Sequence, residues 1–136
     1  MTDRYAVIGN PIVQSKSPLI HSAFAKSTQQ DLEYTKIEGP IDGFEAAVLA
    51  FRDAGGRGMN VTAPFKLQAF ELATDSSERA RQAGAVNALK FDGERILAFN
   101  CSGPLEVVTR ERLLQDLGPR LVALRDQVRA LTGGRY

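Results

Sequence analysis

The order of the predicted strands and helices constrains the fold of this chain more than any other feature of its sequence. Three short apolar segments, residues 5–9, 32–38 and 58–62, are each followed by a segment whose apolar residues recur at helical spacing. Short apolar runs bounded by glycine, proline and polar residues are typical of strands buried in a sheet. Strands that are joined through helices usually run parallel, because such a connection crosses over the sheet. The sequence therefore predicts an α/β fold.

Local signals predict where the helices begin and end. Ser17 is expected to cap the first helix, with the proline that follows it as the first helical residue. Asp42 is expected to open the second helix, and Gly55 and Gly56 to close it. Pro64 suits the first turn of the third helix.

A hairpin is predicted at the end of the sheet. Residues 86–91 and 95–99 are typical of strands, and Asp92-Gly93-Glu94 between them is a hairpin signal. A short helix over residues 78–83 precedes them, after a break at residues 74–77 that contains a capping residue. The complete prediction is a three-layer α/β fold with a mainly parallel sheet, an antiparallel hairpin margin and helices on both faces.

Composition excludes several classes of function. The 136 residues suit one globular domain, and a net charge of +1 gives no indication of binding to nucleic acid or to an acidic membrane surface. No apolar run approaches the length of a membrane span, so a cytoplasmic protein without a membrane partner is expected. Cys101 and His21 are the only residues of their types, which excludes an intramolecular disulfide and makes a metal site unexpected.

Polar side chains are concentrated where the first and third predicted strands end. Ser15 and Ser17 follow the first strand, and Asn60, Thr62 and Lys66 surround the end of the third. Right-handed crossovers place these two loops at the same edge of the sheet, where open α/β sheets hold small ligands. Within residues 60–66 alone, an alternative is equally compatible with the sequence: Thr62 caps a helix and Lys66 lies in water.

The chain changes character after residue 103. Leucine and valine recur every three or four residues between Leu114 and Leu131, and Gly118-Pro119 is expected to divide this stretch into helices over about 105–117 and 119–131. We therefore predict a domain over residues 1–103 and a helical tail over 104–136. The tail is expected to pack on the same domain or to pair with another copy, forming a homodimer through residues 105–131.

Four motifs stand out in the sequence, namely YAVIGNP at 5–11, SKSP at 15–18, GMNVTAPFK at 58–66 and GAVN at 84–87. Their order and spacing make residues 1–100 similar to the N-terminal, substrate-binding domain of shikimate dehydrogenases. The resemblance implies that Ser15 and Ser17 bind the shikimate carboxylate and that Lys66 contacts the hydroxyl that is oxidised. It implies carboxylate or hydroxyl contacts for three further residues: Asn60, Thr62 and Asn87.

Residue chemistry agrees with these implied roles, although each residue has a structural alternative. A small polyhydroxylated acid needs several fixed neutral donors and acceptors, and an ammonium adds charge-assisted bonds. Ser17 can also cap a helix and Asn87 can hold the start of a strand, whereas His21 fits a packed or surface position better than a catalytic one. With all four motifs present, we favour ligand binding for the serines, Asn60, Lys66 and Asn87, and less strongly for Thr62.

The sequence departs from the family in two places. Where the family has Asn-Thr-Asp-Gly, this chain has Asn100-Cys101-Ser102-Gly103. Ser102 can still hydrogen-bond to substrate, but it has no charge with which to assist proton transfer by Lys66. The family also continues into an NADP-binding domain with a glycine-rich turn after a strand, and these 136 residues contain no such turn. No cofactor is therefore expected to be bound by this chain.

These observations predict a domain that binds shikimate or 3-dehydroshikimate, in aromatic amino-acid biosynthesis, and that is unable alone to catalyse NADP-dependent oxidation. One alternative is a working dehydrogenase in which a separate partner supplies NADP. Another is an oligomerisation or interaction protein that acts through the leucine-rich tail.

Overall fold

The computed structural model describes residues 1–100 together with residues 115, 123 and 126. By its internal contacts the chain divides into Met1–Cys101 and Ser102–Tyr136. Ser102 lies outside the described residues, and so do the predicted helices of the tail and the predicted dimer surface at 105–131, apart from residues 115, 123 and 126. These expectations, and the domain boundary after residue 103, therefore stay predictions.

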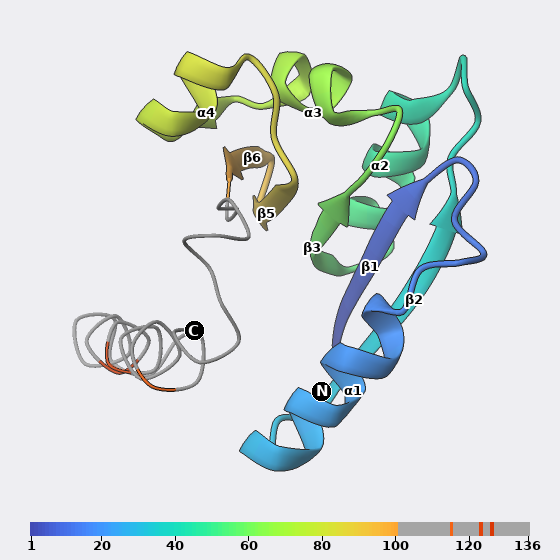
Figure 1. Ribbon diagram of the computed structural model, residues 1–136, viewed down its shortest axis with the longest axis vertical. Coiled ribbons are helices and arrows are strands. Elements are labelled where there is room, and N and C mark those ends of the chain that lie inside the picture. The colour runs from blue at the N-terminus through green and yellow to red at the C-terminus, as the bar shows by residue number, and fades with distance from the viewer. Residues whose placement is uncertain (101–114, 116–122, 124–125, 127–136) are drawn as a thin grey trace. The chain divides into compact units, whose positions relative to one another are not determined.

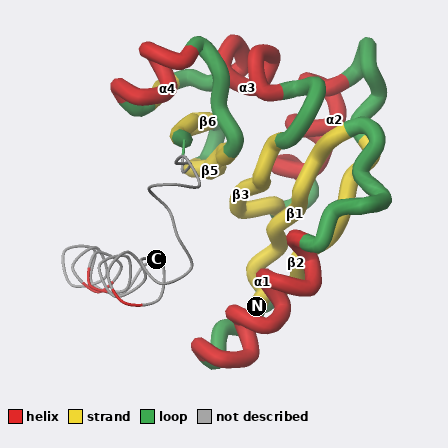
Figure 2. The backbone as a smooth tube through the Cα atoms, in the orientation of Figure 1, coloured by secondary structure: helices red, strands yellow, loops and turns green. Residues whose placement is uncertain are grey.

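A six-stranded mixed sheet forms the centre of the first unit, with the strand order β2-β1-β3-β5-β6-β4 (Figures 1 and 2). The strands are β1 (Asp3–Gly9), β2 (Leu32–Glu38), β3 (Gly56–Val61), β4 (Asp75–Ser76), β5 (Ala88–Asp92) and β6 (Arg95–Phe99). β1 pairs in parallel with both β2 and β3, whereas β5 pairs antiparallel with β3 and with β6. The predicted α/β fold, with its parallel half and its antiparallel hairpin margin, is confirmed.

Helices cover both faces of this sheet. They are α1 (Ser17–Thr28), α2 (Phe44–Asp53), α3 (Lys66–Leu72) and α4 (Glu78–Ala83). Because side chains alternate along a strand, Ala6 and Ile8 of β1 join the larger core beneath α2, α3 and α4, while Val7 faces the other way. Val7 and Tyr34 form a smaller core on the face where α1 packs against β1 and β2 (Figure 1). None of the helices in residues 1–100 is long and apolar enough to cross a bilayer.

Several predicted helix boundaries are wrong by one or two residues. α1 begins at Ser17 itself, after Lys16, and no side chain caps it, so Ser17 is not a cap. α2 begins at Phe44 rather than Asp42, and Gly56 belongs to β3 instead of closing α2. Neither helix start has a side-chain cap, so the capping chemistry of Ser17 and Asp42 is not used.

The third helix also begins later than predicted. Pro64 follows a cis peptide bond and lies outside α3, which begins at Lys66 with Phe65 at the N-cap position. No side chain caps α3, which excludes the alternative in which Thr62 serves only as a helix cap.

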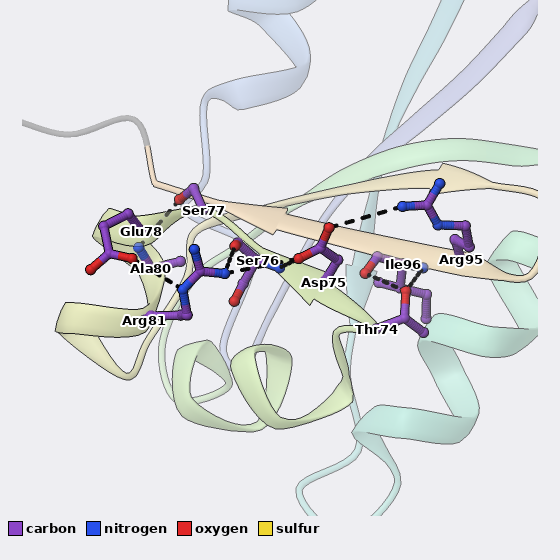
Figure 3. A network of polar contacts seen from close by, with 9 residues as sticks. All are labelled: Thr74, Asp75, Ser76, Ser77, Glu78, Ala80, Arg81, Arg95 and Ile96. Carbon is purple, nitrogen blue, oxygen red and sulfur yellow. Dashed lines mark hydrogen bonds and ion pairs between the residues drawn. The ribbon is translucent and has the colours of Figure 1, made fainter.

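A two-residue strand, β4, lies at the edge of the sheet where the sequence predicts only a break (Figure 3). The hydroxyl of Thr74 donates to the Ile96 carbonyl at 3.1 Å and accepts from the Ile96 amide at 2.9 Å, extending the backbone pairing of β4 with β6. Ser77 then caps α4, because its Oγ accepts from the Ala80 amide at 3.2 Å. The capping residue predicted in this segment is therefore confirmed.

Candidate functional site

The carboxyl ends of β1 and β3 lie side by side, as the strand order predicts. The Thr62 amide donates to the Ile8 carbonyl at 3.0 Å, and the Asn10 amide donates to the Ala63 carbonyl at 3.1 Å. These bonds continue the parallel pairing of β1 with β3 beyond the ends of the strands. The two polar loops are thereby joined at one edge of the sheet.

The close approach of these loops requires glycine at position 9. A Cβ atom on Gly9 would lie 2.4 Å from Cγ2 of Thr62 and 3.2 Å from the Ala63 carbonyl oxygen. We expect Gly9→Ala to lower the free energy of unfolding by about 1–3 kcal/mol, the usual effect of overpacking, as measured by urea denaturation. Adding Thr62→Ser, which removes the Cγ2 atom, should recover most of the loss. A double variant as unstable as Gly9→Ala would contradict this explanation.

A cavity of about 460 Å³ opens at this edge of the sheet. This volume is within the usual range for small-molecule sites. The residues that line it come from β1, β3, α1, α3 and the connecting loops: Val7, Ile12, Gln14, Ser15, Ser17, His21, Asn60, Val61, Thr62, Lys66 and Asn87. Six of the seven predicted site residues are thus brought together, and Ser102 lies outside the described part of the chain.

The chemistry of this lining favours a small anion with several hydroxyl groups. Lys66 supplies an ammonium, and no carboxylate is among the described residues that line the cavity. Hydroxyl and amide side chains supply neutral donors and acceptors, while Val7, Ile12 and Val61 offer apolar surface to a carbon ring. Among residues 1–100, no group of His, Cys, Asp and Glu side chains is arranged to hold a metal ion.

The two serines are coupled to each other. The Ser15 hydroxyl donates to Oγ of Ser17 at 3.2 Å, and the Ser17 amide donates to Oγ of Ser15 at 3.3 Å. Lys36 of β2 also holds their loop in place, since its Nζ donates to the Val13 carbonyl at 2.6 Å. The serine hydroxyls therefore form one preorganised pair of groups on the cavity wall.

Asn60 lies between two protein partners. The Tyr34 hydroxyl donates to Oδ1 of Asn60 at 2.6 Å, and Nδ2 of Asn60 donates to the Asn87 carbonyl at 3.3 Å. The same carbonyl accepts from the Val61 amide at 2.9 Å. The backbone of Asn87 therefore helps to join β3 to the segment that precedes β5, while its side chain lines the cavity.

Asn100 supports the segment that carries Asn87. Its Oδ1 accepts from the Asn87 amide at 3.1 Å, and its Nδ2 donates to the Ala85 carbonyl at 2.7 Å. Because the side chain bridges two backbone groups, it fixes the turn between α4 and β5. Asn100 thus contributes to the site without lining the cavity.

His21 of α1 stacks on Tyr34 of β2, with ring centroids 4.2 Å apart and an angle of 2° between the planes. Burial lowers the pKa of His21 below its usual 6.5. Burial also raises the pKa of Tyr34 to about 12, although a hydrogen bond from the Ser17 side chain has the opposite effect. Both rings are therefore neutral at pH 7, and His21 is a packed residue that also lines the cavity.

The lowered pKa of His21 makes a pH-dependent contribution to stability. The unfolded chain binds the imidazole proton more readily than the folded chain does, so stability should decrease as the pH falls through about 6.5. His21→Phe keeps an aromatic ring but cannot be protonated. In urea denaturation at pH 7 and pH 5, we expect wild type to lose more stability than His21→Phe. Equal losses in the two proteins would contradict the prediction.

Sequence reasoning missed Tyr34 as a residue of the site. It lies within a predicted strand and is 9% exposed, so the strand pattern indicates only a core position for it. Its hydroxyl reaches Asn60 across β1, which lies between β2 and β3 in the sheet. The one available signal was a polar atom on a buried side chain, which normally needs a partner.

Comparison with known proteins assigns this chain to a family. Residues 7–89 match the model of the family described as "Shikimate dehydrogenase substrate binding domain". The shikimate dehydrogenase (NADP(+)) of Herminiimonas arsenicoxydans is 61% identical over 103 residues, which are 76% of this chain and 38% of that protein. The chain therefore spans well under half the length of this relative.

Solved structures agree with this match. An Ael1 enzyme from Pseudomonas putida is 64% identical, with a TM-score of 0.72 over 73% of this chain and 36% of that one. The shikimate 5-dehydrogenase of Thermus thermophilus, solved in complex with NADP(H) and shikimate, is 30% identical, with a TM-score of 0.69 over 73% of this chain and 38% of that one. The chain belongs to the family of shikimate dehydrogenase substrate-binding domains.

Proposed function

We propose that this chain binds shikimate or 3-dehydroshikimate in the cavity at the carboxyl ends of β1 and β3. The observation that carries the proposal is the cavity lining, in which one ammonium, several hydroxyls and amides, and an apolar surface converge, with no carboxylate among the lining residues that the structure describes. This combination suits a carbon ring that carries one carboxylate and several hydroxyls. Family membership supports the same ligand class.

In this proposal the cavity residues divide into two groups. Ser15 and Ser17 hold the ligand carboxylate, because their neighbouring hydroxyls can exchange their present bonds within the protein for bonds donated to the ligand. Asn60, Thr62 and Asn87 bind the carboxylate or the ring hydroxyls. Lys66, the first residue of α3, contacts the hydroxyl that is oxidised in the family, where an amine can accept a proton. Ser102 is proposed as a further, neutral contact.

We also propose that the 136-residue chain alone does not oxidise shikimate with NADP. In the described residues, the loops after β1, β2 and β3 carry Pro11, Pro40 and Pro64, and none has the three glycines of a dinucleotide-binding turn. These residues do not fit NADP. Ser102 also supplies no charge at the position of the family aspartate. Without a positioned hydride acceptor, the effective concentration needed for hydride transfer is not reached.

Calorimetric titration of the purified chain with shikimate tests binding. We expect a saturable signal at millimolar concentration or below, and a much weaker one with cyclohexenecarboxylate, which has the ring and the carboxylate but no hydroxyls. Ser17→Ala should weaken binding, whereas Ser22→Ala, at an exposed position of the same helix, should not. The absence of heat and of thermal stabilisation in a folded sample would refute the binding proposal.

A second assay tests the catalytic part of the proposal. Shikimate-dependent reduction of NADP by the purified chain is expected to stay at background. Turnover well above background that disappears in Lys66→Ala would show instead that the chain is a working dehydrogenase.

A further inference from the structure

The hydrogen bonds around Asn60 determine the orientation of its amide. A backbone carbonyl only accepts hydrogen bonds, so the atom 3.3 Å from the Asn87 oxygen must be Nδ2. The atom on the other side, 2.6 Å from the Tyr34 hydroxyl, is therefore Oδ1, and the Tyr34 hydroxyl must be the donor. The opposite orientation would place two acceptors, Oδ1 and the Asn87 carbonyl, against each other.

This arrangement limits what Asn60 can offer to a ligand. An asparagine amide has two N–H groups, and one of them is used by the Asn87 carbonyl. Oδ1 already accepts from Tyr34 through a short bond. Because Asn60 lines the cavity, the second N–H of Nδ2 is its remaining donor for a bound molecule.

We propose that Tyr34 is a positioning residue, whose hydroxyl fixes the Asn60 amide so that the second N–H is presented to an acceptor oxygen of the bound hydroxy acid. The inference rests on the proposed function for the identity of the ligand. It assigns Asn60 the role of donor at this point of the cavity, and it assigns Tyr34 a role in binding although Tyr34 does not line the cavity.

The packing around Tyr34 holds its ring in a fixed position, as a positioning residue requires. The residue is 9% exposed, and its ring stacks on His21 at 4.2 Å and packs with Val7 and Ile12. The final torsion of an asparagine side chain is broad, so without the tyrosine the amide would be restrained mainly by its longer bond to Asn87. The neutral phenol, with a pKa raised by burial, stays a donor throughout the physiological range.

Tyr34→Phe tests the proposal, because it removes the hydroxyl and keeps the ring that stacks on His21. The substitution also removes the hydrogen bond between Tyr34 and the Ser17 side chain, so a double-mutant cycle assigns the loss to Asn60. Shikimate binding measured by calorimetry should weaken about tenfold, equivalent to ~1.4 kcal/mol. Tyr5→Phe is the matched control, since Tyr5 is a half-buried tyrosine that packs against the same small core and does not line the cavity. Unchanged binding in Tyr34→Phe, or equal weakening in Tyr5→Phe, would overturn the proposal.

A double-mutant cycle separates positioning from a general effect on the fold. In an Asn60→Ala background, Tyr34→Phe should weaken binding by less than about twofold, since no amide remains to be positioned. A full tenfold loss in that background would show that Tyr34 acts independently of Asn60, which would overturn the proposal.

The orientation of the Asn60 amide can be tested in the protein without ligand, independently of whether shikimate binds. In ¹⁵N–¹H spectra, the side-chain NH₂ pair of Asn60 is identified as the pair that disappears in Asn60→Asp. Tyr34→Phe should shift this pair, and Tyr5→Phe should leave it in place. If wild type does not bind shikimate, the proposed function is refuted. The positioning role of Tyr34 is refuted by a different result, namely NH₂ signals of Asn60 that do not shift in Tyr34→Phe.

Discussion

Replacing Phe65 by alanine is expected to lower the free energy of unfolding by about 3–5 kcal/mol, the usual range for a fully buried phenylalanine. Phe65 is 0% exposed and stacks on Phe44 with ring centroids 4.8 Å apart. It lies so close to the backbone that a Cβ atom on Gly39 would be 2.7 Å from its ring. Few groups can move to fill the space that an alanine would leave.

The measurement is urea denaturation of wild type, Phe65→Ala and a control, Leu67→Ala. Leu67 lies two residues further on, in the first turn of α3, but is 61% exposed, so its removal should change stability by less than about 0.5 kcal/mol. Similar losses in the two variants would contradict the assignment of Phe65 to the core. Because Phe65 directly precedes Lys66, the variant should also bind shikimate more weakly under conditions in which it remains folded.

Asn60→Ala is expected to reduce shikimate binding about 100-fold, which corresponds to ~2.7 kcal/mol. The substitution removes a donor from the cavity and also leaves the Tyr34 hydroxyl and the Asn87 carbonyl without one of their partners. Each unsatisfied polar group in a partly buried site is unfavourable by about 1–3 kcal/mol, so the variant should also be less stable to urea. The loss of binding should exceed that of Tyr34→Phe, because Asn60→Ala removes the donor itself whereas Tyr34→Phe only frees its orientation.

Calorimetry on folded samples checks this expectation, with circular dichroism as the test of folding. Gln82→Ala is the matched amide deletion, at an exposed position of α4 away from the cavity. Asn60→Asp keeps the size of the side chain but has no donor for the Asn87 carbonyl, so it should bind as weakly as Asn60→Ala. An affinity for shikimate close to that of wild type in either Asn60 variant would show that Asn60 does not bind the ligand.

Much of the fold was predictable because each of its larger elements has a local signal. Strand β2 spans the predicted residues 32–38, and the hairpin strand β6 spans residues 95–99. Helix starts were less predictable, since Ser17 and Asp42 have capping chemistry but neither caps a helix. β4 was missed because a two-residue strand has no periodicity, and its pairing partner β6 lies more than 20 residues away.

The residues of the candidate site were predictable from position and chemistry together. Five of these residues lie at or just after the ends of strands that the order of elements makes parallel neighbours, and the structure gathers them around one cavity: Ser15, Ser17, Asn60, Thr62 and Lys66. Asn87 joins them from the segment before the hairpin, where the resemblance to the family placed it. Their roles in binding remain proposals for the titrations above.

The sequence by itself determined the order of the larger strands and helices, the sheet edge at which polar side chains collect, and the family. These features depend on periodicity and on short motifs, which are local properties of the chain. Only the tertiary structure decided how the amide of Asn60 is oriented. That orientation depends on Tyr34, which is 26 residues away and lies across an intervening strand, and on the backbone of Asn87, which is 27 residues away. A hydrogen bond has a direction only when both partners are in place, and packing of the sheet brings these partners together.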